Sequence, residues 1–429
     1  MDCSCATPRR FADRKALHWL CVALPVMAGG CIETNSPKDD DAIQIGALLP
    51  YTGDMAASGV NLERALLMAE EQVNRAGGVA GRDLSVVARN GADLDHGLAS
   101  AEALLARPQL MTVLGPQVAD LFQVVSPMVD AAGLYGMLPS EMALSSDDGP
   151  GPVRWFHLAP RIETVACAMA QTIYNDFHMN LVILATDDAY NRTFAQALYN
   201  TYTSLTYMGA APSATLHVFG AEEWGTSINL QSALPQETDV VALITFPTTG
   251  AVIIQDWAAA SRHNLWYFGP ALRADVFVAN APMGVIEGMK GFSTYIPEDS
   301  GLRFSAQFAG RWAGDTPLTD AYYYYDALAL SALAIEAAAQ KIGGMPTSSQ
   351  VRDEIIPLTR GGGPQVDWQN LDDAIDLVHH GYPVHYVGAS GHVDMTDDGY
   401  LQKTIETVSV WRVADGRVQP FVKTTCVAE

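Results

Sequence analysis

Basic residues are scarce in this chain: 25 lysines and arginines stand against 48 aspartates and glutamates among 429 residues, a formal net charge of −23. Nucleic-acid binding needs a basic surface that neutralises phosphates, so this balance argues against a nucleic-acid partner. Long apolar runs are also missing. No stretch reaches the roughly 18 consecutive apolar residues of a membrane-spanning helix, so we expect none.

Short motifs of well-known catalytic sites are absent as well. Beyond the first 31 residues there is no nucleophile elbow (GxSxG), no phosphate loop (GxxxxGK[ST]), no HExxH and no CxxC. The sequence therefore contains none of these sets of residues that would indicate a catalytic site. We expect a protein that is not an enzyme and that needs no cofactor.

The N-terminus has the features of an export signal. Four basic residues precede the apolar stretch "ALHWLCVALPVM" (16–27), which is too short to cross a bilayer, and "AGGC" ends at Cys31. Small residues before a cysteine resemble the lipobox of bacterial lipoproteins. We therefore expect a signal peptide over 1–30, lipidation of Cys31 and a polar tether over 31–42. The alternative is an ordinary signal peptide cleaved near Ala28.

Cysteine is rare in the part that would remain after export. Cys3, Cys5 and Cys21 would leave with the signal, which leaves Cys167 and Cys426 besides the lipidated cysteine. Two cysteines in an exported chain are compatible with a disulfide, and equally with two buried free thiols.

From Ile43 onward, short apolar runs alternate with helical patterns. "IQIGALL" is followed by a helix to about Arg75, and a second series with similar order begins near residue 162. Buried strands flanked by helices indicate parallel sheets covered on both faces. The sequence predicts two doubly wound, Rossmann-like α/β lobes, and an antiparallel hairpin around the "ADG" turn near the C-terminus.

Four of the ten histidines fall within fourteen residues, in "HHGYPVHYVGASGH": His379, His380, His385 and His392. Neutral imidazoles bind zinc or nickel. The segment is rich in glycine, however, and lacks the i, i+4 spacing of zinc-binding helices. We therefore interpret it as a surface or hinge-lining loop and expect no metal site.

Several segments together resemble the type I periplasmic binding proteins, the branched-chain amino acid (Leu/Ile/Val) receptors of ABC transporters. "NRAGGVAGR" (74–82) after the first helix is the most specific, and "VLGPQVAD", "ATDDAYNRTFAQAL" and "SGHVDMTDDGY" also fit. The resemblance covers about residues 43–422. It implies two lobes joined by three crossovers, with lobe 1 formed by 43–157 plus 292–385 and lobe 2 by 158–291 plus 386–429.

The resemblance also implies a ligand cleft between the lobes, built from the loops that follow the strands. Matched positions give eight candidate ligand-binding residues: Tyr51, Thr52, Gln117, Ser140, Glu141, Tyr190, Phe246 and Arg273. Glu141 either pairs with a ligand ammonium group or is solvated at the rim. "GPQVAD" lacks the family's Ser/Thr pair and "SEMAL" replaces its small-residue run. These departures argue against an ordinary leucine-type ligand, so we expect another amino acid or a small polar amide.

The resemblance implies an extracytoplasmic solute-binding protein that delivers its ligand to ABC permease subunits in the membrane, and the lipobox-like N-terminus adds the expected lipid anchor. The alternative is a lipoprotein of the same fold that senses the ligand and signals through a separate partner. Ile32 after Cys31 is not the Asp that favours inner-membrane retention in some bacteria, so we expect a periplasmic location at the outer membrane.

Overall fold

The computed structural model describes residues 41–140, 153–206, 211–220, 240–260, 264–402 and 407–426. The predicted signal peptide, Cys31 and Glu141 lie outside these ranges, as does most of the predicted tether. Among the helices within them, none combines the length and the apolar character needed to cross a membrane.

The first sheet is parallel throughout and has the strand order β2-β1-β3-β4-β5. The inner strand β1 is buried along its whole length, which explains its largely apolar sequence. The five strands are β1 (Ile43–Leu49), β2 (Leu84–Asn90), β3 (Leu110–Leu114), β4 (Tyr135–Leu138) and β5 (Trp155–His157).

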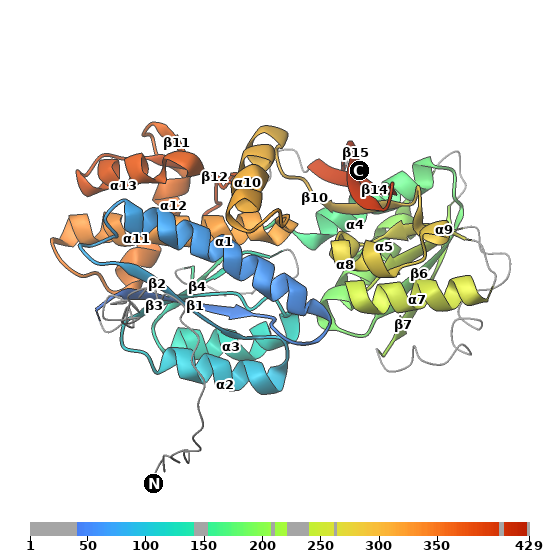
Figure 1. The fold of residues 1–429 in the computed structure, drawn as a ribbon, viewed down its shortest axis with the longest axis horizontal. Coiled ribbons are helices and arrows are strands. Elements are labelled where there is room, and N and C mark those ends of the chain that lie inside the picture. Colours follow the sequence, from blue (N-terminus) through green and yellow to red (C-terminus); the bar gives the residue numbers. More distant parts are fainter. Residues whose placement is uncertain are drawn as a thin grey trace, which may run out of the picture. The chain divides into compact units, whose positions relative to one another are not determined.

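Helices cover both faces of this sheet (Figure 1). Alternate residues of β1 point to opposite sides: Ile45 and Ala47 pack in the core beneath α1 (Ala56–Arg75) and α11 (Thr319–Ile342). Leu48 packs instead with α2 (Leu94–Leu105) and α3 (Ala119–Ala131). α12 (Ser348–Arg360) and α13 (Leu371–His379) add to the first of these cores.

The second sheet has seven strands in the order β15-β14-β10-β9-β8-β6-β7. The five strands β10, β9, β8, β6 and β7 pair in parallel, and β14 and β15 add an antiparallel edge. The strands are β6 (Asn180–Thr186), β7 (Ser213–Phe219), β8 (Val240–Ile244), β9 (Leu265–Phe268), β10 (Lys290–Thr294), β14 (Thr407–Ala414) and β15 (Arg417–Thr425).

This sheet is again covered on both faces. One core contains α4 (Ile162–Asn175) and α5 (Ala189–Ser204), and the other contains α7 (Pro247–Ala259), α8 (Asp275–Asn280) and α9 (Met283–Ile286). The 3-10 helix η3 (Pro270–Leu272) links β9 to α8. The predicted class, two doubly wound α/β lobes, is confirmed.

A small third sheet, β11-β12-β13, follows α10 (Glu298–Arg311) and α12 along the chain. Its strands are β11 (Gln365–Asp367), β12 (His385–Gly388) and β13 (Gly391–His392), and the 3-10 helix η4 (Trp368–Asn370) follows β11.

The predicted lobe boundaries at 157/158, 291/292 and 385/386 stay a prediction. Two observations favour placing the second and third boundaries later in the chain. β10, which ends at Thr294, belongs to the second sheet, whereas Val393 and Met395 pack in the core of the first.

Candidate functional site

The loop after β1 is held by a neighbouring strand end. The Asn90 side chain, at the end of β2, accepts a hydrogen bond from the Tyr51 backbone N–H at 3.1 Å and donates one to Thr52 Oγ1 at 3.1 Å. The chain then enters the 3-10 helix η1 (Gly53–Met55) and α1. A side chain at Gly59 would place its Cβ 2.2 Å from the Pro50 carbonyl oxygen, so glycine allows α1 to pack against the strand end.

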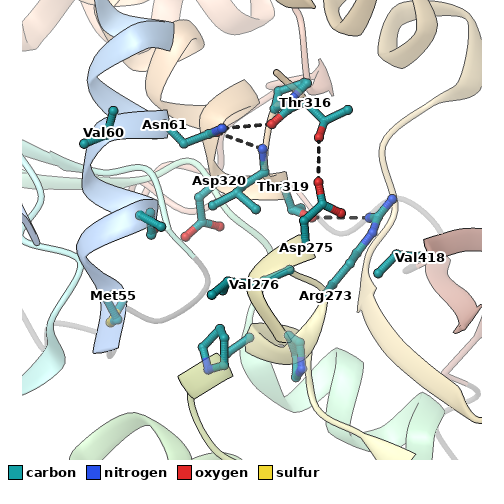
Figure 2. Close-up of a pocket in the computed structure, with 18 of the residues that line it drawn as sticks. Met55, Val60, Asn61, Arg273, Asp275, Val276, Thr316, Thr319, Asp320 and Val418 are labelled. Carbon is teal, nitrogen blue, oxygen red and sulfur yellow. Dashed lines mark hydrogen bonds between the residues drawn. The ribbon is translucent and has the colours of Figure 1, made fainter. Parts of the chain in front are cut away.

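A cavity of about 640 Å³ opens beside this helix start, within the range typical of small-molecule sites (Figure 2). Its walls come from both lobes: the first half of α1 and residues 315–322 on one side, and residues 246–247 and 270–276 on the other. A smaller hollow of about 290 Å³ shares Asp54, Met55, Gln117, Tyr190 and Phe246 with it.

Asp320, in the first turn of α11, is the central polar group of the wall. Its side chain is buried, and its Oδ2 accepts hydrogen bonds from Gln117 Nε2 at 2.7 Å and from Ser140 Oγ at 2.6 Å. Gln117 in turn accepts a hydrogen bond from Ser58 of α1 at 3.2 Å. The loops after β3 and β4 and the first turns of α1 are thereby connected around one carboxylate at the start of α11.

Arg273 brings a positive charge to the same cavity from the second lobe. Its Nη1 donates to Ser293 Oγ at 3.1 Å and to Thr319 Oγ1 at 3.3 Å, next to Asp320 (Figure 2). Thr316 Oγ1 donates to Asp275 Oδ2 at 3.2 Å. These bonds join the η3–α8 turn to the segment that leads into α11.

That segment is fixed by α1. Asn61 Nδ2 donates to the Thr316 carbonyl at 2.8 Å, and its Oδ1 accepts from the Leu318 N–H at 2.9 Å (Figure 2). Arg64 forms an ion pair with Asp315. The cavity is lined by four aspartates but two arginines, Arg64 and Arg273, so its charge balance favours a ligand that carries a positive group.

The structure brings some of the predicted site residues together. Gln117, Tyr190, Phe246 and Arg273 line the large cavity, and Thr52 lines the smaller hollow. Ser140 contacts the cavity wall through Asp320. Tyr51 packs against the core of the first lobe, where burial and the neighbouring Glu63 raise the pKa of its phenol.

The sequence interpretation missed Asn61, Asp275, Thr319 and Asp320. Asp320 follows "TPLT" at the start of a long apolar helix, where an acidic residue has an ordinary role at the helix N-terminus. Nothing in its local pattern distinguishes a ligand-facing carboxylate from a helix start. Tyr322, two residues further along α11, also lines the cavity.

The structure joins the two remaining cysteines. Cys167 of α4 and Cys426, directly after β15, form a disulfide with their Cα atoms 5.5 Å apart. The bond attaches the end of β15, the edge strand of the second sheet, to α4, a helix that covers one face of this sheet.

Two α/β lobes that wall one cavity define a type I periplasmic binding protein. The chain belongs to the periplasmic binding protein family, whose sequence profile matches residues 42–359. This is a family of ligand-binding receptors, not of enzymes. The sequence is 24% identical over 366 residues to the chemotactic signal transduction system substrate-binding protein BasB of Halobacterium salinarum, covering 82% of this chain and 83% of that protein.

Two solved structures show the same fold at 16% identity. One is the leucine-binding protein LivK of Thermotoga maritima, with a TM-score of 0.70 and coverage of 90% of this chain and 99% of that one. The other is LivJ of Streptococcus pneumoniae, a branched-chain amino acid transporter substrate-binding protein in complex with isoleucine. Its TM-score is 0.71, with the same coverage.

Proposed function

We propose that this protein is a lipid-anchored extracytoplasmic solute receptor that captures an amino acid, or a related small amide, between its two lobes and delivers it to an ABC importer. The observation that carries this proposal is Asp320, a buried carboxylate on the wall of a two-lobed cavity that also contains Arg273. Membership of the periplasmic binding protein family and the fold shared with LivK and LivJ support it.

The charges of the cavity suggest how such a ligand is held. In the proposed complex the ligand ammonium group lies against Asp320, and its carboxylate lies toward Arg273. Charge-assisted hydrogen bonds of this kind are shorter and stronger than neutral ones. Gln117 and Ser140 orient the Asp320 carboxylate, while Tyr190 and Phe246 supply apolar surface for the rest of the ligand.

The remaining sequence predictions fit the same proposal. Cys31 would carry the lipid anchor at the outer membrane, and residues 31–42 would form the tether to the folded body. Thr52 would contact the ligand from the smaller hollow, and Glu141 would either bind its ammonium group or remain solvated at the rim. The chain would pass between lobes near 157, after β10 and after Met395.

A thermal-shift comparison of matched ligands tests the proposal. The compounds are leucine, its amide, the amine without the carboxylate (3-methylbutylamine) and the acid without the amine (4-methylpentanoate). Ligand binding to the folded state raises the melting temperature by mass action. Among these four compounds we expect leucine or its amide to raise the melting temperature most, and a wider panel of amino acids and amides to reveal the best ligand. No shift with any amino acid or amide at millimolar concentration would contradict the proposal.

Asp320→Asn keeps the shape of the side chain but removes its charge. Because a hydrogen bond to a charged group contributes about 1.5–3 kcal/mol, we expect the variant to bind the best ligand at least about tenfold more weakly by calorimetry. Asp299→Asn, at an exposed acid of α10, is the matched control and should bind normally. Equal affinities of the Asp320 variant and the control would exclude Asp320 as the ammonium partner.

Sensing is the second candidate function, because the relative BasB is named as part of a chemotactic signal transduction system. The two functions differ in what the cell loses when the gene is deleted. Loss of uptake of the radiolabelled ligand supports transport. Loss of movement toward the ligand, with uptake intact, supports sensing through a separate partner.

A further inference from the structure

Two imidazoles and a carboxylate meet on the small third sheet, outside the ligand cavity. They belong to His385 at the start of β12, His392 at the end of β13 and Asp394 two residues later. One ligand atom from each of the three lies within 4.8 Å of the others. The expectation of a metal-free loop rested on the missing helical spacing, but strand pairing rather than a helix brings these side chains together.

The register of the hairpin explains the cluster. β12 and β13 pair antiparallel, with Val387 opposite His392 and Gly388 opposite Gly391. Continuing this register places Asp394 opposite His385. Residues two apart on a strand point to the same face, so His392 and Asp394 share a face with the residue across from them. The directly opposed pair His385 and Asp394 and the diagonal neighbour His392 can thus converge on one point.

The backbone holds two of the three residues in place. His385 Nε2 lies 2.7 Å from Asp394 Oδ1, and these side chains are 18% and 27% exposed. The His385 N–H donates to the Pro364 carbonyl at 2.9 Å, and the Asp394 carbonyl accepts from the Gln402 N–H at 2.7 Å. His392 is exposed, with its ring centroid 6.2 Å from that of His385. The third group is therefore free to rotate toward the other two and leaves the cluster open to solvent.

We propose that His385, His392 and Asp394 form a binding site for a divalent transition-metal cation, with Zn²⁺ as the fitting ion. Zinc binds imidazole nitrogen and carboxylate oxygen at about 2.0–2.2 Å, so two ligand atoms of a tetrahedral site lie about 3.4 Å apart. His385 Nε2 and Asp394 Oδ1 reach this distance by separating slightly from 2.7 Å, and a turn of the exposed His392 side chain supplies the third ligand. Three protein ligands leave one position of a tetrahedral site for water.

The donor set also discriminates between cations. Ca²⁺ and Mg²⁺ take oxygen ligands, and the cluster offers them one carboxylate. Nickel and copper share the preference for imidazole, so they compete with zinc here. Arg360 of α12 pairs with Asp397 at 2.5 Å, so its charge is compensated by an acid outside the cluster. The bound cation fastens the β12–β13 hairpin shortly before the chain continues to β14 in the second sheet.

The simpler interpretation is a His385–Asp394 hydrogen bond in which His392 plays no part. Calorimetric titration of the purified full chain, free of any histidine tag and treated with EDTA, distinguishes a metal site from this simple hydrogen bond. We expect ZnCl₂ to bind with one saturable site, and CaCl₂ not to compete. Co²⁺ bound at the same site should give the visible absorption of nitrogen and oxygen coordination.

His392→Gln is the decisive variant, because the side chain is exposed and its loss should leave the fold intact, as circular dichroism can verify. We expect it to weaken Zn²⁺ binding at least about tenfold, and Asp394→Asn to do the same. His380→Gln is the matched control: His380 is an exposed histidine of the same segment whose ring lies 2.8 Å from the Asp376 carbonyl of its own helix.

A second control tests whether any His–Asp pair would suffice. His96 and Asp93 form such a pair at 2.8 Å on the surface, and among the described residues no third metal-ligating side chain groups with them. His96→Gln should therefore leave Zn²⁺ binding unchanged. The proposal is overturned if the full chain shows no saturable site, if His392→Gln binds Zn²⁺ as tightly as the unmodified protein, or if either control weakens binding as much. These outcomes are independent of the amino acid ligand.

Discussion

At the scale of the residue, His157 at the end of β5 should make the protein sensitive to acid. It is buried and its ring stacks on Tyr400, with the centroids 4.1 Å apart. Burial first, and then the nearby Arg161, lower the pKa of its imidazole to about 3. An unfolded chain binds the proton near pH 6.5, so between about pH 6.5 and 3 the unfolded state holds more protons and stability falls as the pH falls.

His157→Phe keeps a ring at this position and removes the titration. From pH 7 to pH 5 the unmodified protein should lose about 2 kcal/mol of unfolding free energy through His157, a loss that the variant does not show. Urea denaturation at pH 7 and pH 5 measures this difference. His96→Phe, at an exposed histidine, should retain the acid sensitivity of the unmodified protein. Identical pH dependence of His157→Phe and the unmodified protein would refute the role of His157.

Single residues also show where sequence reasoning stops. Gln117, Tyr190, Phe246 and Arg273 follow strands or begin helices, and in an open α/β sheet such positions point toward the ligand crevice. The resemblance to the family could therefore nominate them by position. Asp320 reaches the same cavity from a helix that begins more than 180 residues after β4. Its closeness to Gln117 is a consequence of chain crossing between lobes, which no local pattern encodes.

At the scale of the element, the disulfide should stabilise the antiparallel edge of the second sheet. Cys426 follows β15, an edge strand whose residues are largely exposed, and Cys167 lies within α4. A replacement of both cysteines by serine should lower the unfolding free energy by about 2–4 kcal/mol and lower the melting temperature. Hydrogen exchange read by mass spectrometry should increase in β15 and much less in β1. Unchanged exchange in β15 would contradict a role of the bond in holding this strand.

Element boundaries were predictable where pattern and turn chemistry agree. The β14–β15 hairpin was expected from alternation around "ADG", and the structure has Asp415 and Gly416 at the turn with positive φ of 53° and 71°. The third sheet was not expected, because strands of two to four residues are too short to display a period of two. The same short strands hid the convergence of His385 with Asp394.

At the scale of the whole molecule, closure of two lobes around a ligand depends on contacts that only the closed state makes. Thr249 of α7 donates a hydrogen bond to Asp54 of η1 at 2.5 Å, which joins the second lobe to the first beside the cavity. A bond present only in the closed state shifts the equilibrium between open and closed forms toward the closed form, so losing it lowers the ligand affinity.

Thr249→Val replaces the hydroxyl by a methyl group of similar size. A typical hydrogen bond contributes about 0.5–1.5 kcal/mol, so we expect the dissociation constant of the best ligand to rise about 2- to 10-fold. The melting temperature without ligand should change little, since the bond links lobes rather than filling a core. Thr248→Val, at the exposed neighbouring position of the same helix, is the matched control and should bind as the unmodified protein does. A Thr249 variant that binds as tightly as this control, measured by calorimetry on both proteins, would show that closure does not use the Asp54 contact.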